Sequence, residues 1–425
     1  MSMEEKQNFL TSQDSDFLYP EKEKDVEEII KKFYKSNTPI EVIGTGSKRK
    51  IGKPIQCAKT ISLSRLEGIV KYLPEELYIT VKAGTKITEI ENQLKKNNQQ
   101  LAFEPIDFGY LFLGKSNSGT AAGQVACNIA GPRRFKVGSA RDHILGFRGV
   151  NGRGEIIKSG GTVVKNVTGY DLSKLISNSY GTLVVLTEIT LKVLPKPEAS
   201  KTLVIHNLDI NLANEYLAKA ISSENDISGA SFLPIEPSCN QCEMNIEKTF
   251  KLNDLKHEGS ITAIRIEGSK NSIKERTENL KKEIKVLDEN ISELDTLQSE
   301  IFWKKITNLE FFSGTKNNIF RIVIPPSESV QLLYQLPKNF KYFLDWGGAL
   351  IWVEACDINE QLFNSIRKKV IKHKGYVTMI KNSEYLPFVE DVFTIDISKF
   401  NISQSIKKSF DPKRILNPGK MYTGI

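Results

Sequence analysis

The chain has 425 residues and a mass of 47.9 kDa, which is enough for two or three domains of ordinary size. Hydrophobic residues make up 40% and charged residues 26%, the composition of an ordinary soluble protein. The excess of 59 Lys and Arg over 51 Asp and Glu gives a net charge of +8 without any basic block; this does not support nucleic acid as a partner and suits an anionic cofactor or a small acidic substrate.

The cysteines are few, odd in number and mostly scattered: Cys57, Cys127, Cys239, Cys242 and Cys356. This pattern predicts reduced thiols in a cytosolic protein and argues against a disulfide framework. The N-terminal stretch MSMEEKQNFLTSQDSDF is polar and acidic, so we expect no signal peptide. No run of about 18 apolar residues predicts a membrane span.

Roughly the first 200 residues alternate strands and helices. Apolar residues at helical spacing predict a helix over 23–37, and the alternating stretch 38–44 predicts a strand that leads into GTGSKRKIG. A strand over 78–85 is followed by an amphipathic helix over 85–99. Further strands, the first two joined by a hairpin turn at NGRGE, are predicted over 144–151, 155–161 and 181–195.

Residues 195–198 are predicted to form a linker. The composition changes after it, with fewer glycines and longer charged helices. The segments within 318–381 follow the order β-α-β-β-α-β of a ferredoxin-like sheet with its helices on one face, and the preceding series is expected to be an incomplete copy. We therefore expect an α+β fold with a first domain over 1–197, a second over 198–404 and a tail over 405–425 that returns towards the first.

GYLFLGKS, residues 109–116, matches the P-loop pattern G-x-x-x-x-G-K-[ST], which would indicate ATP binding. Its bulky middle residues suit a loop around a phosphate poorly, and Pro105 lies where the preceding strand should be hydrogen-bonded. The following NSGTAAG is too rich in Ser and Gly for a first helical turn. We interpret the match as chance.

Two other stretches are rich in small residues. In GTGSKR, Gly44 and Gly46 allow close backbone approach to an anion, and Ser47 and Lys48 add donors, although a simple β-turn explains the same residues. The small residues of 120–131 would let the backbone lie flat against a large rigid ligand such as a dinucleotide, or form a close-packed turn. Two such stretches about 70 residues apart favour the ligand.

Several ordered motifs carry a resemblance to a known family: IEVIGTGSK, VKAGTKITEIENQLKKNNQQLAFEP, TAAGQVACNIAGPRR, GSARDHILGFRGVNGRGE, the most specific KNVTGYDLSKLISNSYGTLVVLTEITLKVLP, and later RIVIPP, LDWGGALIWVEA and LNPGK. In these the chain resembles flavoproteins of the vanillyl-alcohol oxidase type, in particular the FAD-binding subunits of bacterial glycolate oxidases. The resemblance is strong over 38–197 and patchy elsewhere. It implies a two-part PCMH-type FAD-binding domain over 1–197 and a cap domain for substrate or partner over 198–404.

The resemblance also implies FAD as the cofactor and a set of residues that contact it. The residues expected along the diphosphate and flavin are Gly44, Thr45, Gly46, Ser47, Lys48, Thr120, Ala122, Gly123 and Ala126, with Pro105 and Gly119 nearby. Those expected near the ribityl chain are Ser139, Arg141 and Asp142, and those at the adenosine half are Gly181, Thr182 and Ile189. Relatives that attach FAD covalently often use a His or Cys in or near the first loop, and because GTGSKR has neither we expect non-covalent FAD.

The catalytic residues stay unknown from the sequence. Oxidation of a 2-hydroxy acid needs a base for the hydroxyl proton and cations for the carboxylate. Close relatives carry a His-containing EHGxG-like stretch and metal-binding histidines, and this chain has no such motif, so we expect no metal. Arg265 and Arg321 could hold a carboxylate or be ordinary strand-edge cations. His373 is a further candidate, or an imidazole at an exposed helix end.

Other residues have ordinary structural explanations. Trp346 could face the flavin, although core packing is the better explanation, and His143 marks the start of a predicted strand. Cys239 and Cys242 form a lone CxxC that His257 does not complete to a standard zinc spacing. We interpret these as loop cysteines, with a metal or redox role as the alternative.

The resulting hypothesis is an FAD-binding subunit of a glycolate oxidase (glycolate dehydrogenase) complex, an FAD-dependent oxidoreductase acting on the CH–OH group of glycolate to give glyoxylate. The resemblance implies a second FAD subunit and an iron–sulfur subunit as partners, electron transfer towards the respiratory chain, and a cytoplasmic protein with peripheral association to the inner membrane. The missing His motif favours electron relay over substrate turnover. The alternatives are a stand-alone FAD dehydrogenase of another 2-hydroxy acid or alcohol, and a flavin-free scaffold, against which the intact loops argue.

Overall fold

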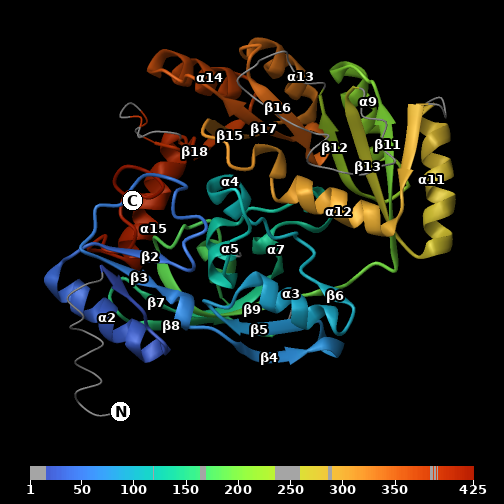
Figure 1. Ribbon diagram of the computed structural model, residues 1–425. Helices are drawn as coiled ribbons and strands as arrows, with labels where there is room; N and C mark the ends of the chain where they lie inside the picture. Colours follow the sequence, from blue (N-terminus) through green and yellow to red (C-terminus); the bar gives the residue numbers. More distant parts are fainter. Residues whose placement is uncertain are drawn as a thin grey trace.

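The computed structural model describes residues 16–117, 119–162, 169–234, 259–285, 290–382, 386, 389 and 391–425 of the chain. Within these residues the strands form four sheets, arranged as an N-terminal part and a large sheet that lies above it in the view of Figure 1. No helix of the described ranges is long and apolar enough to cross a membrane. The fold is α+β with antiparallel sheets, as the sequence predicts.

The N-terminal part contains a parallel sheet of order β1-β3-β2, an antiparallel sheet of order β4-β5-β9-β7-β8 and the pair β10-β6. Its strands are β1 (Phe17–Leu18), β2 (Ile40–Ile43), β3 (Lys59–Ser62), β4 (Ile69–Leu73), β5 (Tyr78–Lys82), β6 (Gln99–Gln100), β7 (Ile144–Asn151), β8 (Ile156–Gly160), β9 (Val184–Lys192) and β10 (Leu194–Pro195). The hairpin predicted at NGRGE joins β7 and β8.

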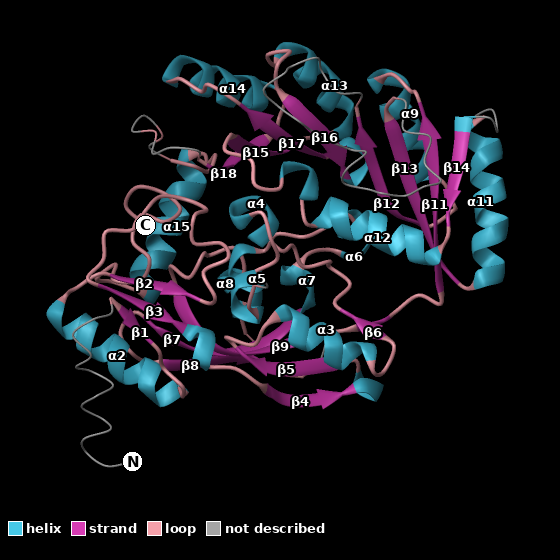
Figure 2. Cartoon of the chain, in the orientation of Figure 1, coloured by secondary structure: helices cyan, strands magenta, loops and turns pink. Residues whose placement is uncertain are grey.

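Helices α2 and α3 form where their apolar periodicity predicts, and each buries its apolar stripe on the strands of this part. The helices are α2 (Glu23–Ser36), α3 (Ile87–Lys95), α4 (Gly109–Leu113), α5 (Ala121–Cys127), α6 (Arg134–Val137), α7 (Ala140–His143) and α8 (Leu172–Ile176), with the short 3₁₀ helices η1 (Leu63–Arg65) and η2 (Pro74–Glu76). Figure 2 shows α5 and α7 between the N-terminal strands and the large sheet.

The large sheet has the strand order β14-β11-β13-β12-β16-β17-β15-β18 and is antiparallel throughout. Its strands are β11 (Ala199–His206), β12 (Ile227–Leu233), β13 (Ile261–Gly268), β14 (Ile291–Leu294), β15 (Asn318–Val323), β16 (Lys341–Asp345), β17 (Leu350–Ala355) and β18 (Tyr376–Lys381). Each half repeats the ferredoxin-like order, and the halves meet where β12 pairs with β16. The first half is therefore a complete copy, where the sequence indicates an incomplete one.

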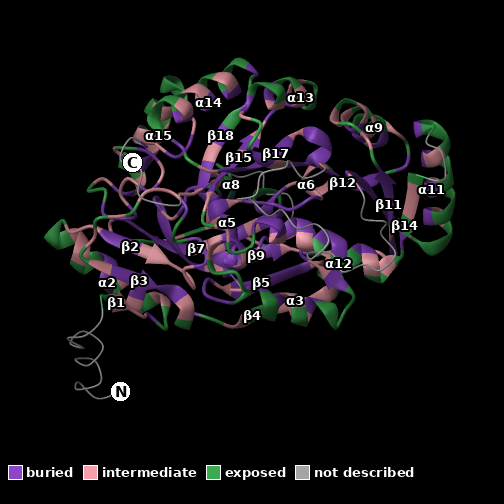
Figure 3. Cartoon of the chain, turned by 45° about the horizontal axis from the view of Figure 1, so that its top comes forward, coloured by how far each residue is buried: buried purple, intermediate pink, exposed green. Residues whose placement is uncertain are grey.

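Helices α9 (Ile210–Ser222), α11 (Lys270–Ile284), α13 (Pro326–Gln335) and α14 (Glu360–Lys372) cover the outer face of the large sheet, whereas α12 (Thr296–Thr307) lies on the face towards the N-terminal part (Figure 1). Short 3₁₀ helices are η4 (Glu310–Phe312) and η5 (Trp346–Gly348), and α15 (Ile397–Phe410) follows the sheet. The strands β5, β7 and β9 and most strands of the large sheet are largely buried, whereas β4 and β8 are partly exposed and each outer helix has an exposed face (Figure 3).

The GYLFLGKS stretch is helical where a P-loop would need an open loop. Its first residues form α4, in which Leu111 is fully buried. Gly114 has a φ of 67°, a left-handed conformation that ends the helix. A side chain at Gly109 would collide with the backbone of Asn117. The stretch therefore packs into the core, in agreement with a chance match.

The end of the chain is bound back to the N-terminal part by a buried lysine. Lys407 on α15 donates to the carbonyl oxygens of Thr182 and Leu416, at 2.7 and 2.9 Å, and to the Asp411 carboxylate at 2.9 Å. The same carboxylate accepts hydrogen bonds from the backbone N–H groups of Ile415 and Leu416. Leu416 in turn forms a bridge with Ile40 of β2. This network fixes the final segment beside the start of the first small-residue loop.

We expect Lys407→Met to lower the free energy of unfolding by about 3–5 kcal/mol, because it leaves the buried Asp411 carboxylate without its counter-charge. Urea unfolding of the two proteins measures the difference. The control is Lys408→Met, which changes an exposed neighbour and should stay within about 0.5 kcal/mol of the parent. Equal stability of the two variants would contradict the structural role of Lys407.

Candidate functional site

The first small-residue loop starts where β2 ends, at Ile43. Gly46 has a φ of 80°, which favours glycine. Gly44 lies against Thr120, and a Cβ at Gly44 would come within 2.2 Å of the Thr120 Oγ1. Because only glycine permits this approach, the loop touches the second small-residue stretch, which is distant in sequence.

The second stretch forms α5, whose first turn begins at Ala121 within NSGTAAG, so the expectation that this segment is too rich in Ser and Gly for a first helical turn is wrong. The Thr120 hydroxyl caps this helix by accepting a hydrogen bond from the Gly123 N–H at 3.2 Å. Ala121 and Val125 are fully buried in the N-terminal core, while Ala122 and Gly123 face the first loop. Small side chains thus leave space between the loop and the helix.

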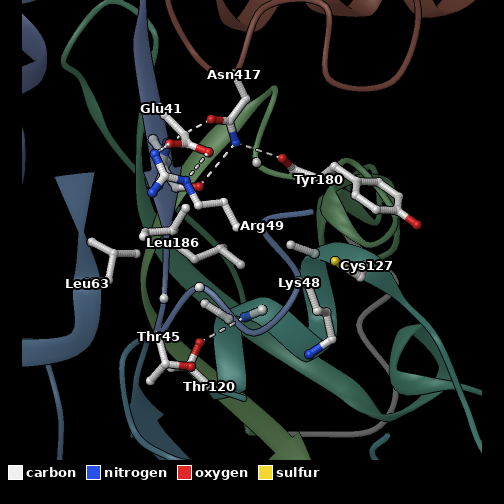
Figure 4. Close-up of a pocket in the computed structure, with 18 of the residues that line it drawn as sticks. Glu41, Thr45, Lys48, Arg49, Leu63, Thr120, Cys127, Tyr180, Leu186 and Asn417 are labelled. Carbon is white, nitrogen blue, oxygen red and sulfur yellow. Dashed lines mark hydrogen bonds and ion pairs between the residues drawn. The ribbon is translucent and has the colours of Figure 1, made fainter. Parts of the chain in front are cut away.

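An open cleft lies between the two stretches, with about 720 Å³ of space between its walls when the opening to solvent is included (Figure 4). The structure brings many of the predicted cofactor residues to its wall: Gly44, Thr45, Gly46, Ser47, Lys48, Thr120, Ala122, Gly123, Ala126 and Gly181.

The remaining predicted cofactor residues lie elsewhere. Gly119 adjoins the Lys48 Nζ but does not itself line the cleft. The others take part in local structure: Pro105 bridges to Ala130, Ser139 and Asp142 cap α7, Arg141 lines a groove between α8 and α15, Thr182 donates to the Ser179 carbonyl, and Ile189 is buried in β9.

The cleft also contains residues that no sequence pattern assigns to a site. The Asn417 side chain accepts a hydrogen bond from the Val42 N–H at 2.7 Å and donates to the Tyr180 carbonyl at 2.8 Å, so it joins both walls (Figure 4). Lys420, Tyr180 and Cys127 line the cleft as well. The only signal for Asn417 and Lys420 was the LNPGK motif, which pointed to a family and not to a site.

Two buried lysines give the cleft its positive charge. Lys420 donates to the Arg49 carbonyl oxygen at 2.7 Å, and burial lowers its pKa to about 8. The Lys48 Nζ is buried without a hydrogen-bond partner among the described residues, and burial lowers its pKa as well. A buried cation without a partner is unfavourable until an anion reaches it. A cleft with flat walls and two buried cations fits an anionic dinucleotide such as FAD.

A buried ion-pair cluster joins the N-terminal part to the large sheet. Arg133 donates to the Glu267 carboxylate at 2.8 and 2.6 Å and lies 3.1 Å from Glu104. Arg265 donates to Glu104 at 2.7 Å and to the Ser228 carbonyl at 2.8 Å. The guanidinium of Arg265 is therefore already neutralised by the protein itself, which argues against the carboxylate-binding role considered for it.

Arg321 on β15 is in the opposite situation. Its Nε is buried, and within the described ranges it has no hydrogen-bond partner. The guanidinium lies 5.1 Å from the ring centroid of Trp346, which Arg134 approaches at 5.7 Å. Burial lowers the pKa of Arg321 to about 10, and Tyr180 of the cleft wall is near enough to oppose this shift. Two guanidinium groups thus approach one indole; Arg134 also lies 3.7 Å from the Asp142 carboxylate, and Asp345 is near enough to Arg321 to oppose the lowering of its pKa.

The histidines of the described chain lie away from the cleft. His373 contacts Glu328 at 2.7 Å and Gln335 at 2.9 Å beneath α13, on the outer side of the large sheet. This placement does not favour a catalytic role for it. His143 bonds to the Val137 carbonyl and packs on Phe103.

No group of three or more potential metal ligands occurs among the residues that the structure describes. Cys239, Cys242 and His257 lie outside those residues. Trp346 is buried and donates from its indole N–H to the Gly131 carbonyl at 3.0 Å, so it packs at the boundary between the two parts.

Comparisons with known proteins show what this chain is similar to. Residues 16–160 match the model of the FAD binding domain family. The chain is 32% identical to glycolate oxidase subunit GlcE of Escherichia coli over 389 residues, 91% of this chain and 93% of that protein. It is 27% identical to glycolate oxidase subunit GlcD of Bacillus subtilis over 71% of this chain and 68% of that one. p-Cresol methylhydroxylase shares the fold, with a TM-score of 0.70 at 15% identity, covering 96% of this chain and 88% of that chain.

The buried cluster predicts an acid-sensitive contact between the two parts. Burial alone would raise the pKa of Glu267, but Arg265 and Arg133 hold it well below the ordinary value of 4.5. The stability from this carboxylate is therefore fully present above about pH 4.5 and is lost as the pH falls towards the lower folded pKa. We expect Glu267→Gln to be less stable than the parent near neutral pH and to show a flatter fall in the urea midpoint from about pH 6 to about pH 3.

The control is Glu75→Gln, which removes an exposed carboxyl and should retain the parent's pH dependence. A Glu267→Gln profile parallel to that of the parent would show that the cluster does not stabilise the folded chain in this way.

Proposed function

Because the chain belongs to the family of glycolate oxidase subunit GlcE, we propose that it is an FAD-binding oxidoreductase subunit that serves the oxidation of a 2-hydroxy acid, with glycolate as the substrate. The observation that carries the proposal is a cleft between two small-residue stretches, with cationic side chains, in a chain that aligns with GlcE over 91% of its length. The cofactor supplies the acceptor for the hydride.

FAD is bound without a covalent link in this proposal. Cys127 is the cysteine that lines the cleft, and burial raises the pKa of its thiol. A neutral thiol is a weak nucleophile, so attack by this side chain on the cofactor is disfavoured. The histidines of the described ranges bond elsewhere, as shown above. Diphosphate contacts from Gly44 to Lys48 and from α5 would then hold the cofactor.

Arg321 holds the substrate carboxylate. Its guanidinium is buried on Trp346 beside Arg134, and a carboxylate would satisfy the Nε that has no partner in the described part of the chain. Tyr180 connects this position to the cleft, because it lines the cleft and interacts with Arg321. Arg265 is unsuited to this task because Glu104 and Glu267 already neutralise it.

The subunit works in a complex with a second FAD subunit and an iron–sulfur subunit, to which it passes electrons. The printed names of its relatives, subunits GlcE and GlcD, support an assembly of several chains. No histidine of the described residues reaches the cleft to take the hydroxyl proton, which favours electron relay over independent turnover.

The first test is the visible spectrum of the purified chain, followed by anaerobic addition of glycolate. We expect flavin bands, and release of all the flavin into the supernatant when the protein is precipitated with acid. Bleaching by glycolate is expected when the chain is co-purified with its partner subunits. A colourless chain that cannot be reconstituted with FAD would contradict the proposed function.

The carboxylate-binding role of Arg321 is tested by oxalate, a non-oxidisable analogue whose binding perturbs the flavin spectrum. Arg321→Met should raise the dissociation constant of oxalate by about tenfold to a hundredfold, with a smaller rise in Arg321→Lys, which keeps the charge. Arg367→Met is the matched control, because Arg367 donates to backbone carbonyls of Asp391 and Phe393. Equal oxalate affinity in Arg321→Met and the parent would exclude this role.

A further inference from the structure

The cleft contains two lysines whose side chains are equally buried and differ in one respect. Lys420 is 6% exposed and has a carbonyl partner, whereas Lys48 is 8% exposed and its Nζ has none among the described residues. Figure 4 shows the Lys48 side chain on the Cys127 side of the cleft. Folding has therefore removed one ammonium from water without giving it a hydrogen-bond partner in the part of the chain that the structure describes, which is unfavourable by itself.

Nearby groups do not neutralise Lys48. Asp107 is close enough to raise its pKa, as is Cys127, but the two do not outweigh the effect of burial. The Asp107 oxygens already accept hydrogen bonds from Gly109 N–H at 2.8 Å and from the Ser116 hydroxyl at 2.6 Å. The Phe108 ring lies 5.9 Å from the Nζ, a distance at which a cation–π contact is weak.

Further polar groups surround the same point, beside Gly119. A Cβ at Gly119 would lie 2.8 Å from the Lys48 Nζ, 3.2 Å from the Ser47 Oγ and 3.4 Å from the Gln124 Nε2. The Gln124 amide cannot turn its oxygen to Lys48 without losing the bond from Nε2 to the Ile106 carbonyl at 2.9 Å. Gly119 therefore leaves the space that the ammonium occupies.

We propose that the Lys48 side chain is the counter-charge for the diphosphate of the bound dinucleotide, a role that rests on the proposed binding of FAD. Lys48 ends the loop whose Gly44 contacts Thr120, the N-cap residue of α5, so its backbone and its side chain lie beside the same cleft. The isoalloxazine ring of oxidised FAD is neutral, and the negative charge of the molecule lies on its diphosphate. The unpaired Lys48 ammonium beside this loop is therefore expected to form its ionic contact with the diphosphate.

The proposal predicts effects of opposite sign with and without cofactor. In Lys48→Met the dissociation constant of FAD, measured by flavin fluorescence, should rise by about tenfold to a hundredfold, because a charge-assisted contact is lost. In the FAD-free full-length chain the same variant should have a higher urea midpoint than the parent, because an unpaired buried charge is gone. Lys48→Arg should keep most of the FAD affinity.

Lys420→Met is the matched control. Its ammonium is bonded to the Arg49 carbonyl, so its removal should lower the urea midpoint of the FAD-free chain. The midpoint potential of the bound flavin shows whether Lys48 contacts the diphosphate or the isoalloxazine ring. If Lys48 contacts the diphosphate, Lys48→Met should have the same midpoint potential as the parent.

Unchanged FAD affinity in Lys48→Met, a lower urea midpoint of its FAD-free form, or a weaker affinity accompanied by a fall in midpoint potential would each overturn the role of Lys48. Failure of the parent chain to bind FAD would contradict the proposed function instead, so the two failures are distinct.

Discussion

The contact between Gly44 and Thr120 is the constraint on which the site depends. It brings the loop after β2 against the first turn of α5, and any side chain at Gly44 would have to occupy the position of the Thr120 hydroxyl. Thr120 is itself fixed, because it caps α5. On the other side Asn417 binds Val42 and Tyr180, so segments from the start, middle and end of the chain meet around one cleft.

Two arginines and two lysines differ in whether the fold supplies a partner for the charged side chain. Arg265 and Lys420 have partners within the fold, whereas the Arg321 Nε and the Lys48 Nζ are buried atoms without a hydrogen-bond partner in the described part of the chain. Because burial of an unpaired charge is unfavourable, a residue in the second class is best explained by a ligand that completes it. These two cations lie in different places, Lys48 at the cleft wall and Arg321 on β15 of the large sheet, and we propose the cofactor diphosphate as the ligand of the first and the substrate carboxylate as the ligand of the second.

Much of the fold could be predicted from local patterns. The apolar spacing of α2 and α3 and the hairpin at NGRGE are short-range signals, and the structure confirms them. The sequence does not predict that the first ferredoxin-like copy is complete. Its last strand, β14, has only four residues, ISEL, which show little hydrophobic alternation. The motif-based family prediction is confirmed by the alignment with GlcE.

The site was predictable only in part. Glycine and alanine in loops indicate that another group can approach the backbone closely, so the sequence predicts the two segments that form the cleft walls. The contact of Asn417 with Val42 spans 375 positions, for which no local pattern exists. The sequence also does not predict that Arg265 has an ion-pair partner and Arg321 has none in the described chain, because the partner Glu104 is 161 positions from Arg265. Pairing of charges is a property of the folded chain.

The most direct test of the account is a crystal structure of the chain saturated with FAD. We expect the diphosphate to lie between the loop of Gly44–Lys48 and α5, with the Lys48 Nζ in hydrogen-bond contact with a phosphate oxygen. We also expect FAD to have no covalent bond to the protein. Electron density for FAD outside the cleft lined by these residues, or a covalent link to a side chain, would contradict it.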